Sequence, residues 1–337
     1  MRLGCATTIG CLALALSGPL FAQQPIVIKF SHVVTDDTPK GKGALRFKEL
    51  AEAKTNGRVK VEIYPNSQLY KDREELEALQ LGAVQLLAPS VSKFGPLGVR
   101  QFEVYDLPYM FPNQAVLDRV TDGPVGQGLF KLLEPKGIIG LTYWSNGFKE
   151  FSANKPLRKL DDFKGMKIRI QSSKVLEGEI KALGGIPQVL AFSEVYTALQ
   201  QGVVDGEENT VSNKYTQKMH EVQKHLTMSD HGVVLYAVIV NKKFWEGLPA
   251  DIRKRVAEAM TEASRYEREI AQKENDDALE KIKAAKTTEI YYLPAAEKAI
   301  WRKAMLPLYE QYEPVVGKDL LQSIEKTVNE SANARKG

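Results

Sequence analysis

Short runs of apolar and β-branched residues, many of them alternating with polar ones, mark a series of predicted strands. They lie at 26–30, 59–64, 84–88, 137–144, 166–170, 232–240 and 289–292. Between the first three strands, apolar residues recur at helical spacing over 38–56 and 72–82. Strands that alternate with helices in this way favour an α/β fold with parallel strands and right-handed crossovers.

Less regular patterns connect this first unit to the rest of the chain. Residues 93–112 combine aromatic side chains with prolines and glycines, and we expect irregular structure that packs on the first sheet. Residues 113–134 have a helical pattern. The turn-forming segment 145–149 follows the strand at 137–144, and we predict that the chain first crosses into a second α/β domain there. The apolar strand at 232–240 is predicted to return to the first domain.

The stretch 166–213 holds the candidate chemistry of the second domain. Its strand carries Arg169, helical segments follow at 173–183 and 193–202, and a turn-prone acidic cluster closes it at 205–209. An arginine at a strand end holds a carboxylate with two parallel hydrogen bonds, and a loop asparagine supplies both a donor and an acceptor. An ordinary βαβ-like unit with a surface arginine is the alternative that these residues leave open.

Apolar residues recur close to helical spacing from Pro249 to Ala285. An unbroken helix there is about 55 Å long at ~1.5 Å per residue, which is enough to cross two domains. Two helices with a break near Asn275 are the alternative. Two further amphipathic helices and a frayed tail after Ser331 are predicted to complete the chain.

Composition agrees with a globular protein of two domains. The chain has 337 residues, with 43% hydrophobic and 26% charged residues. Its formal net charge of +4 comes from 46 basic and 42 acidic residues, and this balance gives no reason to expect a nucleic acid or a membrane surface as partner.

The N-terminus has the pattern of a secretory signal peptide, predicted at 1–22. Arg2 precedes an apolar stretch, and a small residue, Ala22, ends it. A membrane anchor is the alternative, but the apolar run is short for a span. Cys5 and Cys11 both lie in this segment, so the mature chain is predicted to contain no cysteine and to depend on its core rather than on disulfides.

Motifs for catalysis are not found in the sequence. No spacing among the four histidines matches a metal site, and the chain has no nucleophile elbow, P-loop or dinucleotide-binding glycine motif. Two carboxylates distant in the chain, as in glycosidases, are not excluded by sequence. We therefore expect a protein without catalytic residues, metal or cofactor.

Six long stretches carry a resemblance to a known family. They are IKFSHVVTDDTPKGKGA, VEIYPNSQLYKDREELEALQLGAVQLLAPS, YWSNGFKEFSANKPL, KIRIQSSKVLE, LAFSEVYTALQQGVVDGEEN and QKMHEVQKHLTMSDHG. In these stretches the chain resembles the periplasmic solute-binding proteins of TRAP transporters, most closely their C4-dicarboxylate-binding branch. The resemblance covers nearly the whole mature chain.

The resemblance implies a two-lobed α/β periplasmic solute-binding fold, with a ligand cleft between the lobes and a long helix spanning both. Lobe I is expected to comprise 23–147 and about 235–274, and lobe II 148–234 and about 275–331. The implied function is that of a periplasmic receptor that binds malate, succinate or fumarate and delivers it to the membrane permease of a TRAP transporter. No enzyme activity is implied.

The resemblance also assigns residues to the ligand site. Arg169 matches the arginine that binds the substrate carboxylate, Lys149 a second basic ligand residue, Asn209 the ligand-facing asparagine and Phe192 an aromatic that packs on the ligand. The positions in the first lobe that align with the cleft are Ser90, Asp72 and His32 or Val33. Thr210 stands where the family usually has proline, and we expect a looser loop around Asn209 and an added hydroxyl near the site.

Three other functions remain compatible with the sequence. The same receptor class binds other organic acids, such as a monocarboxylate, a 2-oxo acid or a sugar acid. A secreted hydrolase on a two-lobed fold is a second alternative. A sensor accessory that hands its ligand to a receptor kinase is the third, because the surface that meets a partner is not legible from the sequence.

Overall fold

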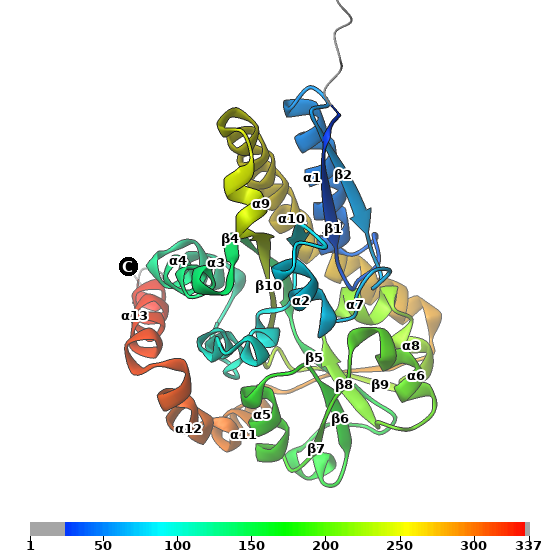
Figure 1. The fold of residues 1–337 in the computed structure, drawn as a ribbon. Helices are drawn as coiled ribbons and strands as arrows, with labels where there is room; N and C mark the ends of the chain where they lie inside the picture. The colour runs from blue at the N-terminus through cyan, green and yellow to red at the C-terminus, as the bar shows by residue number, and fades with distance from the viewer. Residues whose placement is uncertain (1–23, 334–337) are drawn as a thin grey trace, which may run out of the picture.

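Two mixed sheets organise residues 24–333, the part of the chain that the computed structural model describes (Figure 1). The predicted signal peptide therefore lies outside the described residues. Within them, the first sheet has the strand order β2-β1-β3-β10-β4 and the second has the order β11-β9-β5-β8-β6-β7. We call the parts built on these sheets the first and second lobes, and this two-lobed α/β fold confirms the predicted fold class.

The strands of the first sheet are β1 (Ile26–Ser31), β2 (Val59–Tyr64), β3 (Leu86–Leu87), β4 (Ile138–Phe148) and β10 (Val233–Asn241). Those of the second are β5 (Glu150–Ala153), β6 (Lys167–Ile170), β7 (Ile186–Val189), β8 (Gly206–Asn209), β9 (His225–Met228) and β11 (Glu289–Tyr292). Strand β1 pairs in parallel with β2 and β3, whereas β10 is antiparallel to β3 and β4. In the second sheet, β6 lies parallel to both β7 and β8.

Helices cover both sheets. They are α1 (Pro39–Lys54), α2 (Glu74–Gln80), α3 (Gln114–Asp122), α4 (Pro124–Lys131), α5 (Lys174–Ala182), α6 (Val195–Gln200), α7 (Val211–Thr216), α8 (Met219–Val222), α9 (Lys242–Gly247), α10 (Ala250–Ala285), α11 (Ala295–Met305), α12 (Pro307–Val316) and α13 (Lys318–Asn333). The start of α1 is capped by its sequence, since the Thr38 hydroxyl accepts from the Gly41 N–H at 3.0 Å and Pro39 opens the helix.

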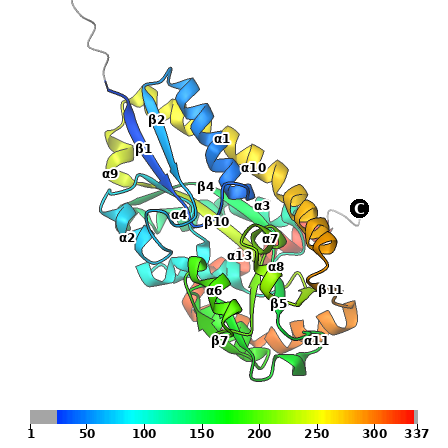
Figure 2. The same ribbon diagram turned by 90° about the vertical axis from the view of Figure 1, so that its right-hand side faces the viewer.

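The long helix α10 is continuous, which excludes the alternative of a break near Asn275. It packs along α1 and β4 in the first lobe and along α7 in the second, and Figure 2 shows it passing α1 on its way to the second lobe. The Asn275 amide donates to the Asn146 carbonyl at 2.8 Å and accepts from the Ser212 N–H at 2.9 Å. One side chain in the middle of α10 therefore binds β4 and α7 together.

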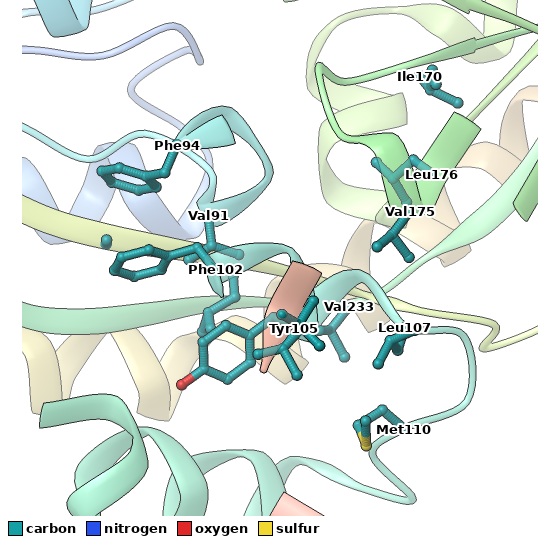
Figure 3. Packing of buried hydrophobic residues seen from close by; sticks show 14 of the residues in the cluster. Val91, Phe94, Phe102, Tyr105, Leu107, Met110, Ile170, Val175, Leu176 and Val233 are labelled. Atoms are coloured by element: carbon teal, nitrogen blue, oxygen red, sulfur yellow. The ribbon is translucent and has the colours of Figure 1, made fainter. Parts of the chain in front are cut away.

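The irregular segment between β3 and α3 contributes its aromatic side chains to the core, as its composition predicts. It forms three short 3₁₀ turns, and Phe94 stacks on Phe102 with ring centroids 4.6 Å apart. Figure 3 shows these rings with Tyr105, and shows Val175 and Leu176 of α5 as members of the same cluster. The two lobes therefore share one apolar cluster.

Several predicted boundaries were wrong. The segment 145–149 is not a turn, because β4 continues to Phe148. Its pairing with β10 has a bulge at Asn146, next to Gly147 with its positive φ of 100°. The helix predicted at 113–134 breaks into α3 and α4 at Gly123-Pro124, since proline favours a helix start. The acidic cluster at 205–209 forms strand β8 instead of a turn.

Other elements were missed altogether. Strands β5, β7 and β9 are four residues each, too short for a clear alternating pattern. Three helices, α11 to α13, follow β11 where two were expected, because Pro307 starts a new helix directly after α11. None of the helices in residues 24–333 has the length and apolar character needed to cross a membrane.

Trp144 anchors α10 to the first sheet and provides a test of this packing. It is fully buried on β4, and its indole N–H donates to the Ser264 hydroxyl of α10 at 2.8 Å. We expect Trp144→Ala to lower the free energy of unfolding by about 3–5 kcal/mol, because it leaves a large cavity and removes the hydrogen bond to the Ser264 hydroxyl. Chemical denaturation measures this, with the half-buried Trp245 changed to alanine as control. An equal loss in both variants would contradict the proposed anchoring role.

Candidate ligand-binding site

A small cavity lies between the lobes, at the carboxyl ends of strands from both sheets. It is lined by Val33, Val34, Asp72, Ser90, Lys93, Arg169, Gln171, Phe192, Asn209, Asn213, Val234 and Tyr236. Val33 follows β1 and Ser90 follows β3 in the first lobe, whereas Arg169 lies on β6 and Asn209 ends β8 in the second. Ligands of open α/β sheets bind at such strand ends.

A larger cavity adjoins the inner one. The inner cavity has a volume of about 20 Å³ and the outer one about 680 Å³. Asp72, Lys93, Arg169 and Gln171 line both. The outer cavity therefore gives a path from the surface to the charged side chains of the inner one.

Arg169 presents one free edge of its guanidinium group. The side chain is buried, and its Nε and Nη2 donate to the Leu190 carbonyl at 3.1 and 2.8 Å. Its Nη1 has no hydrogen-bond partner among the described residues, and the group lies 5.8 Å from the Phe192 ring centroid. The Leu190 carbonyl fixes one edge of the planar guanidinium group. The N–H groups of the other edge are therefore oriented to bind a planar anion such as a carboxylate.

Asp72 links three groups at the rim of the cavity. One carboxylate oxygen pairs with the Lys93 ammonium group, and the other accepts from the Phe192 N–H of the opposite lobe. Burial favours the protonated form of Asp72, but Lys93, Arg169 and the Phe192 N–H outweigh it and hold the pKa of Asp72 below its ordinary value. Asp72 is therefore a carboxylate that partly neutralises two cations, Arg169 and Lys93.

Asn209 is oriented by its neighbours. Its side-chain oxygen accepts from the Asn213 amide at 2.8 Å and from the Thr210 N–H at 3.0 Å. Proline has no N–H, so the second bond exists because residue 210 is threonine. The Thr210 hydroxyl is fully buried and accepts from the Asn146 amide. Thr210 thus ties this loop to β4, in contrast to the looser loop expected from the sequence.

The cavity brings together six of the eight predicted site residues and not the other two. Those that line it are Arg169, Asn209, Phe192, Ser90, Asp72 and Val33. Lys149 does not line it. Its ammonium group lies 2.8 Å from Glu208, and although burial opposes the charged form, Glu208 and Asp106 raise the pKa of Lys149. His32 is also buried away from the cavity, and burial together with Lys40 lowers its pKa to about 3.

Several residues of the cavity were missed by sequence reasoning. They are Lys93, Gln171, Asn213, Tyr236, Val34 and Val234. Gln171 directly follows β6, so a search for polar residues just after strand ends would have found it. Lys93 ends a 3₁₀ turn in the irregular segment, where no sequence period indicates which way a side chain points.

A cleft lined from the strand ends of two α/β lobes, with one helix running along both, defines a two-lobed solute-binding protein. More specifically, the chain belongs to the bacterial extracellular solute-binding proteins of family 7, whose model matches residues 30–314.

Individual members show how close this relationship is. The C4-dicarboxylate-binding periplasmic protein of Rhodobacter capsulatus is 58% identical over 328 residues, covering 97% of this chain and 98% of that protein. A TRAP periplasmic solute-binding protein from Shewanella oneidensis, solved with bound succinate, is 43% identical with a TM-score of 0.88, covering 90% of this chain and 99% of that one. One from Pseudomonas aeruginosa, solved with L-malate, is 43% identical with a TM-score of 0.83, covering 86% and 100%.

Proposed function

We propose that this protein is the extracytoplasmic receptor of a TRAP-type transporter and binds a C4-dicarboxylate such as malate, succinate or fumarate between its lobes. The observation that carries the proposal is a pair of buried cations, Arg169 and Lys93, that line one small cavity. Relatives whose names or crystal ligands are C4-dicarboxylates support the choice of substrate.

The chemistry of a dianion suits this pair. A carboxylate that leaves water loses its hydration and needs fixed N–H or cationic partners in return. In the proposal, the free edge of Arg169 holds one carboxylate, and the ammonium group of Lys93 meets the other. Lys149 is neutralised by Glu208 away from the cavity, so we assign the second carboxylate to Lys93 rather than to Lys149.

The remaining lining residues complete the proposed site. Asn209 and Ser90 supply polar contacts, Phe192 packs on the carbon chain and Val33 forms part of the apolar wall. We propose no ligand contact for His32. Lys149 acts indirectly in this scheme, since its pair with Glu208 fixes strand β8, which ends in Asn209.

We propose that the lobes separate to admit the ligand and close over it. Small-molecule pockets typically measure ~300–1,000 Å³, far more than the inner cavity. Lys71 and Glu194 form a 2.9 Å ion pair across the cleft, and the Phe192 N–H donates a hydrogen bond to Asp72 across it, so these contacts belong to the closed state. The proposed lobes are 23–147 with about 235–274, and 148–234 with about 275–331, except that α13 packs on α3 and α4 of the first lobe.

The family membership supports two further parts of the proposal. We infer that the protein acts in the periplasm after removal of residues 1–22, and that it delivers its ligand to a membrane permease. We also infer that it binds its ligand without converting it, since the cavity is built around fixed cations rather than a nucleophile and a base.

A thermal-shift screen of the mature protein tests the proposal. Ligand at 100 times its dissociation constant stabilises the folded state by ~2.7 kcal/mol, which raises the melting temperature by several degrees. We expect this rise with malate, succinate or fumarate, and none with pyruvate, lactate or hexuronates. A rise only with one of the latter acids would mean that the receptor binds another organic acid. No rise with any of these acids would contradict the proposal that the protein is a receptor for organic acids.

A further inference from the structure

A buried acid lies directly behind the proposed ligand cations. Glu75 on α2 is 1% exposed, and neither of its carboxyl oxygens has a hydrogen-bond partner among the described residues. Its Oε1 lies 3.6 Å from the ammonium group of Lys93, which lines the cavity that Glu75 itself does not reach. Burial away from solvent and from hydrogen-bond donors destabilises the ionised form of a carboxyl group.

Three charged groups face Glu75 from the elements around it. They are Lys93 from the 3₁₀ turn after β3, Asp72 from the loop before α2, and Lys40 from α1. Burial is the largest influence and raises the pKa of Glu75 to about 7, with Asp72 acting in the same direction and the two lysines against it. Burial and Lys93 lower the pKa of Lys40 to about 7, so Lys40 is the other group here that titrates near neutrality.

The charges around the cavity do not balance a dianion while Glu75 is ionised. While Lys40 is protonated, three cations, Arg169, Lys93 and Lys40, face two carboxylates, Asp72 and Glu75. A bound dianion makes this group one charge too negative. One added proton on Glu75 restores neutrality, and an uncompensated charge in a buried site is costly.

We propose that the protein binds a dicarboxylate dianion together with one proton, which the Glu75 carboxylate takes up from solvent to become a neutral carboxylic acid. This inference rests on the proposed function and adds a coupling between ligand and proton. Only an O–H bond forms, and the buffer supplies the proton. Because Lys93 contacts both Glu75 and the proposed ligand position, the ligand competes for the same cation that holds Glu75 ionised.

The sign of the pH dependence follows from linkage. The ligand's negative charge favours neutral Glu75, so the pKa of Glu75 is higher in the complex than its value of about 7 in the free protein. Below pH 7 the group is protonated in both states, and affinity is constant. Above pH 7 affinity falls, by up to about tenfold per pH unit, until the pKa of the complex is passed.

Isothermal titration calorimetry with malate at pH 7.5, in three buffers of different ionisation enthalpy, counts the protons taken up. With a pKa of about 7, roughly three quarters of the Glu75 groups are ionised at this pH, so we expect an uptake of roughly 0.5–0.8 proton per malate. Glu75→Gln is expected to lose most of this proton uptake and most of the pH dependence of affinity from about 6.5 to about 8.5, with any remainder due to Lys40. Glu49→Gln, the same change on an exposed position of α1, should behave as the wild type.

Each outcome decides the inference. Binding without proton uptake in the wild type overturns it, and so does uptake of wild-type size in Glu75→Gln, which would assign the proton to another group such as Lys40. If Glu75→Gln does not fold, infrared difference spectra of the wild type replace it, and a carboxylic acid band must appear when malate is added. Absence of binding by malate and succinate contradicts the proposed function instead, since no titration heat would then be seen.

Discussion

Arg169→Ala is expected to raise the dissociation constant for succinate or malate roughly 30-fold to 5,000-fold. Removing one partner of a buried, hydrogen-bonded charge pair costs about 2–5 kcal/mol, because the other charge stays buried without compensation, and this range of free energy sets the fold-change. Arg169 is expected at the upper end, since its free edge already points away from the Leu190 carbonyl that holds the opposite edge. Calorimetric titration of the purified variant measures the loss.

Two companion variants separate charge from geometry. Arg169→Lys keeps the positive charge but cannot form two parallel hydrogen bonds, so it should recover only part of the affinity. Arg158→Ala removes an exposed arginine of the same lobe, paired with Glu289, and should bind as the wild type. A folded Arg169→Ala variant with wild-type affinity would contradict the assignment of the first carboxylate.

Lys93→Met is expected to abolish the preference for two carboxylates over one. In the wild type, succinate should bind far more tightly than butyrate, which has the same carbon chain with a single carboxylate. Losing the second cation should weaken succinate binding by about 2–5 kcal/mol, while butyrate, held by Arg169, changes little. Competition titrations of the two acids measure the ratio, and it should fall to within a few-fold.

Lys93→Met leaves Asp72 without its main cationic partner, so a control variant must remove the charge of Asp72 as well. In Asp72→Asn/Lys93→Met both members of the pair are neutral, so weak succinate binding there reflects the missing cation and not an unpaired acid. If both variants kept the wild-type preference for succinate, the second carboxylate would have to lie against another cation, as Lys149 was first expected to provide.

The parts of the site that regular strands carry were predictable from the sequence. Arg169 lies in an alternating strand, so its place in β6 follows from periodicity, whereas Asn209 was expected in a turn and instead ends strand β8. Ser90 and Asp72 follow predicted strands, which places them at the ligand-binding edge of the first sheet, and the family resemblance added Phe192 and supported both. All five now line one cavity.

The choice between two lysines was not predictable. Lys149 and Lys93 are both cations close to predicted strand ends, and sequence does not say which has a buried acid beside it. Glu208, which neutralises Lys149, lies on β8 in the neighbouring part of the second sheet, and this pairing depends on tertiary packing. Lys93 also pairs with an acid, but it remains in the wall of the cavity.

Contacts between distant segments also explain why parts of the fold were predicted wrongly. The residues of 145–149 have strong turn propensity, yet Ser145, Gly147 and Phe148 pair with β10 and form the end of strand β4. Likewise, the acidic residues before Asn209 favour a turn locally, whereas β5 and β6 on either side place them in a strand. Pairing between segments distant in the chain outweighs local preference in both cases.

A crystal structure of the protein with succinate tests the central claim most directly, because it locates both carboxylates at once. We predict one carboxylate on the free edge of Arg169 and the other within hydrogen-bond distance of the Lys93 ammonium group, with residues of both lobes in contact with the ligand. Succinate bound outside this cavity, or with neither carboxylate on Arg169, would contradict the account.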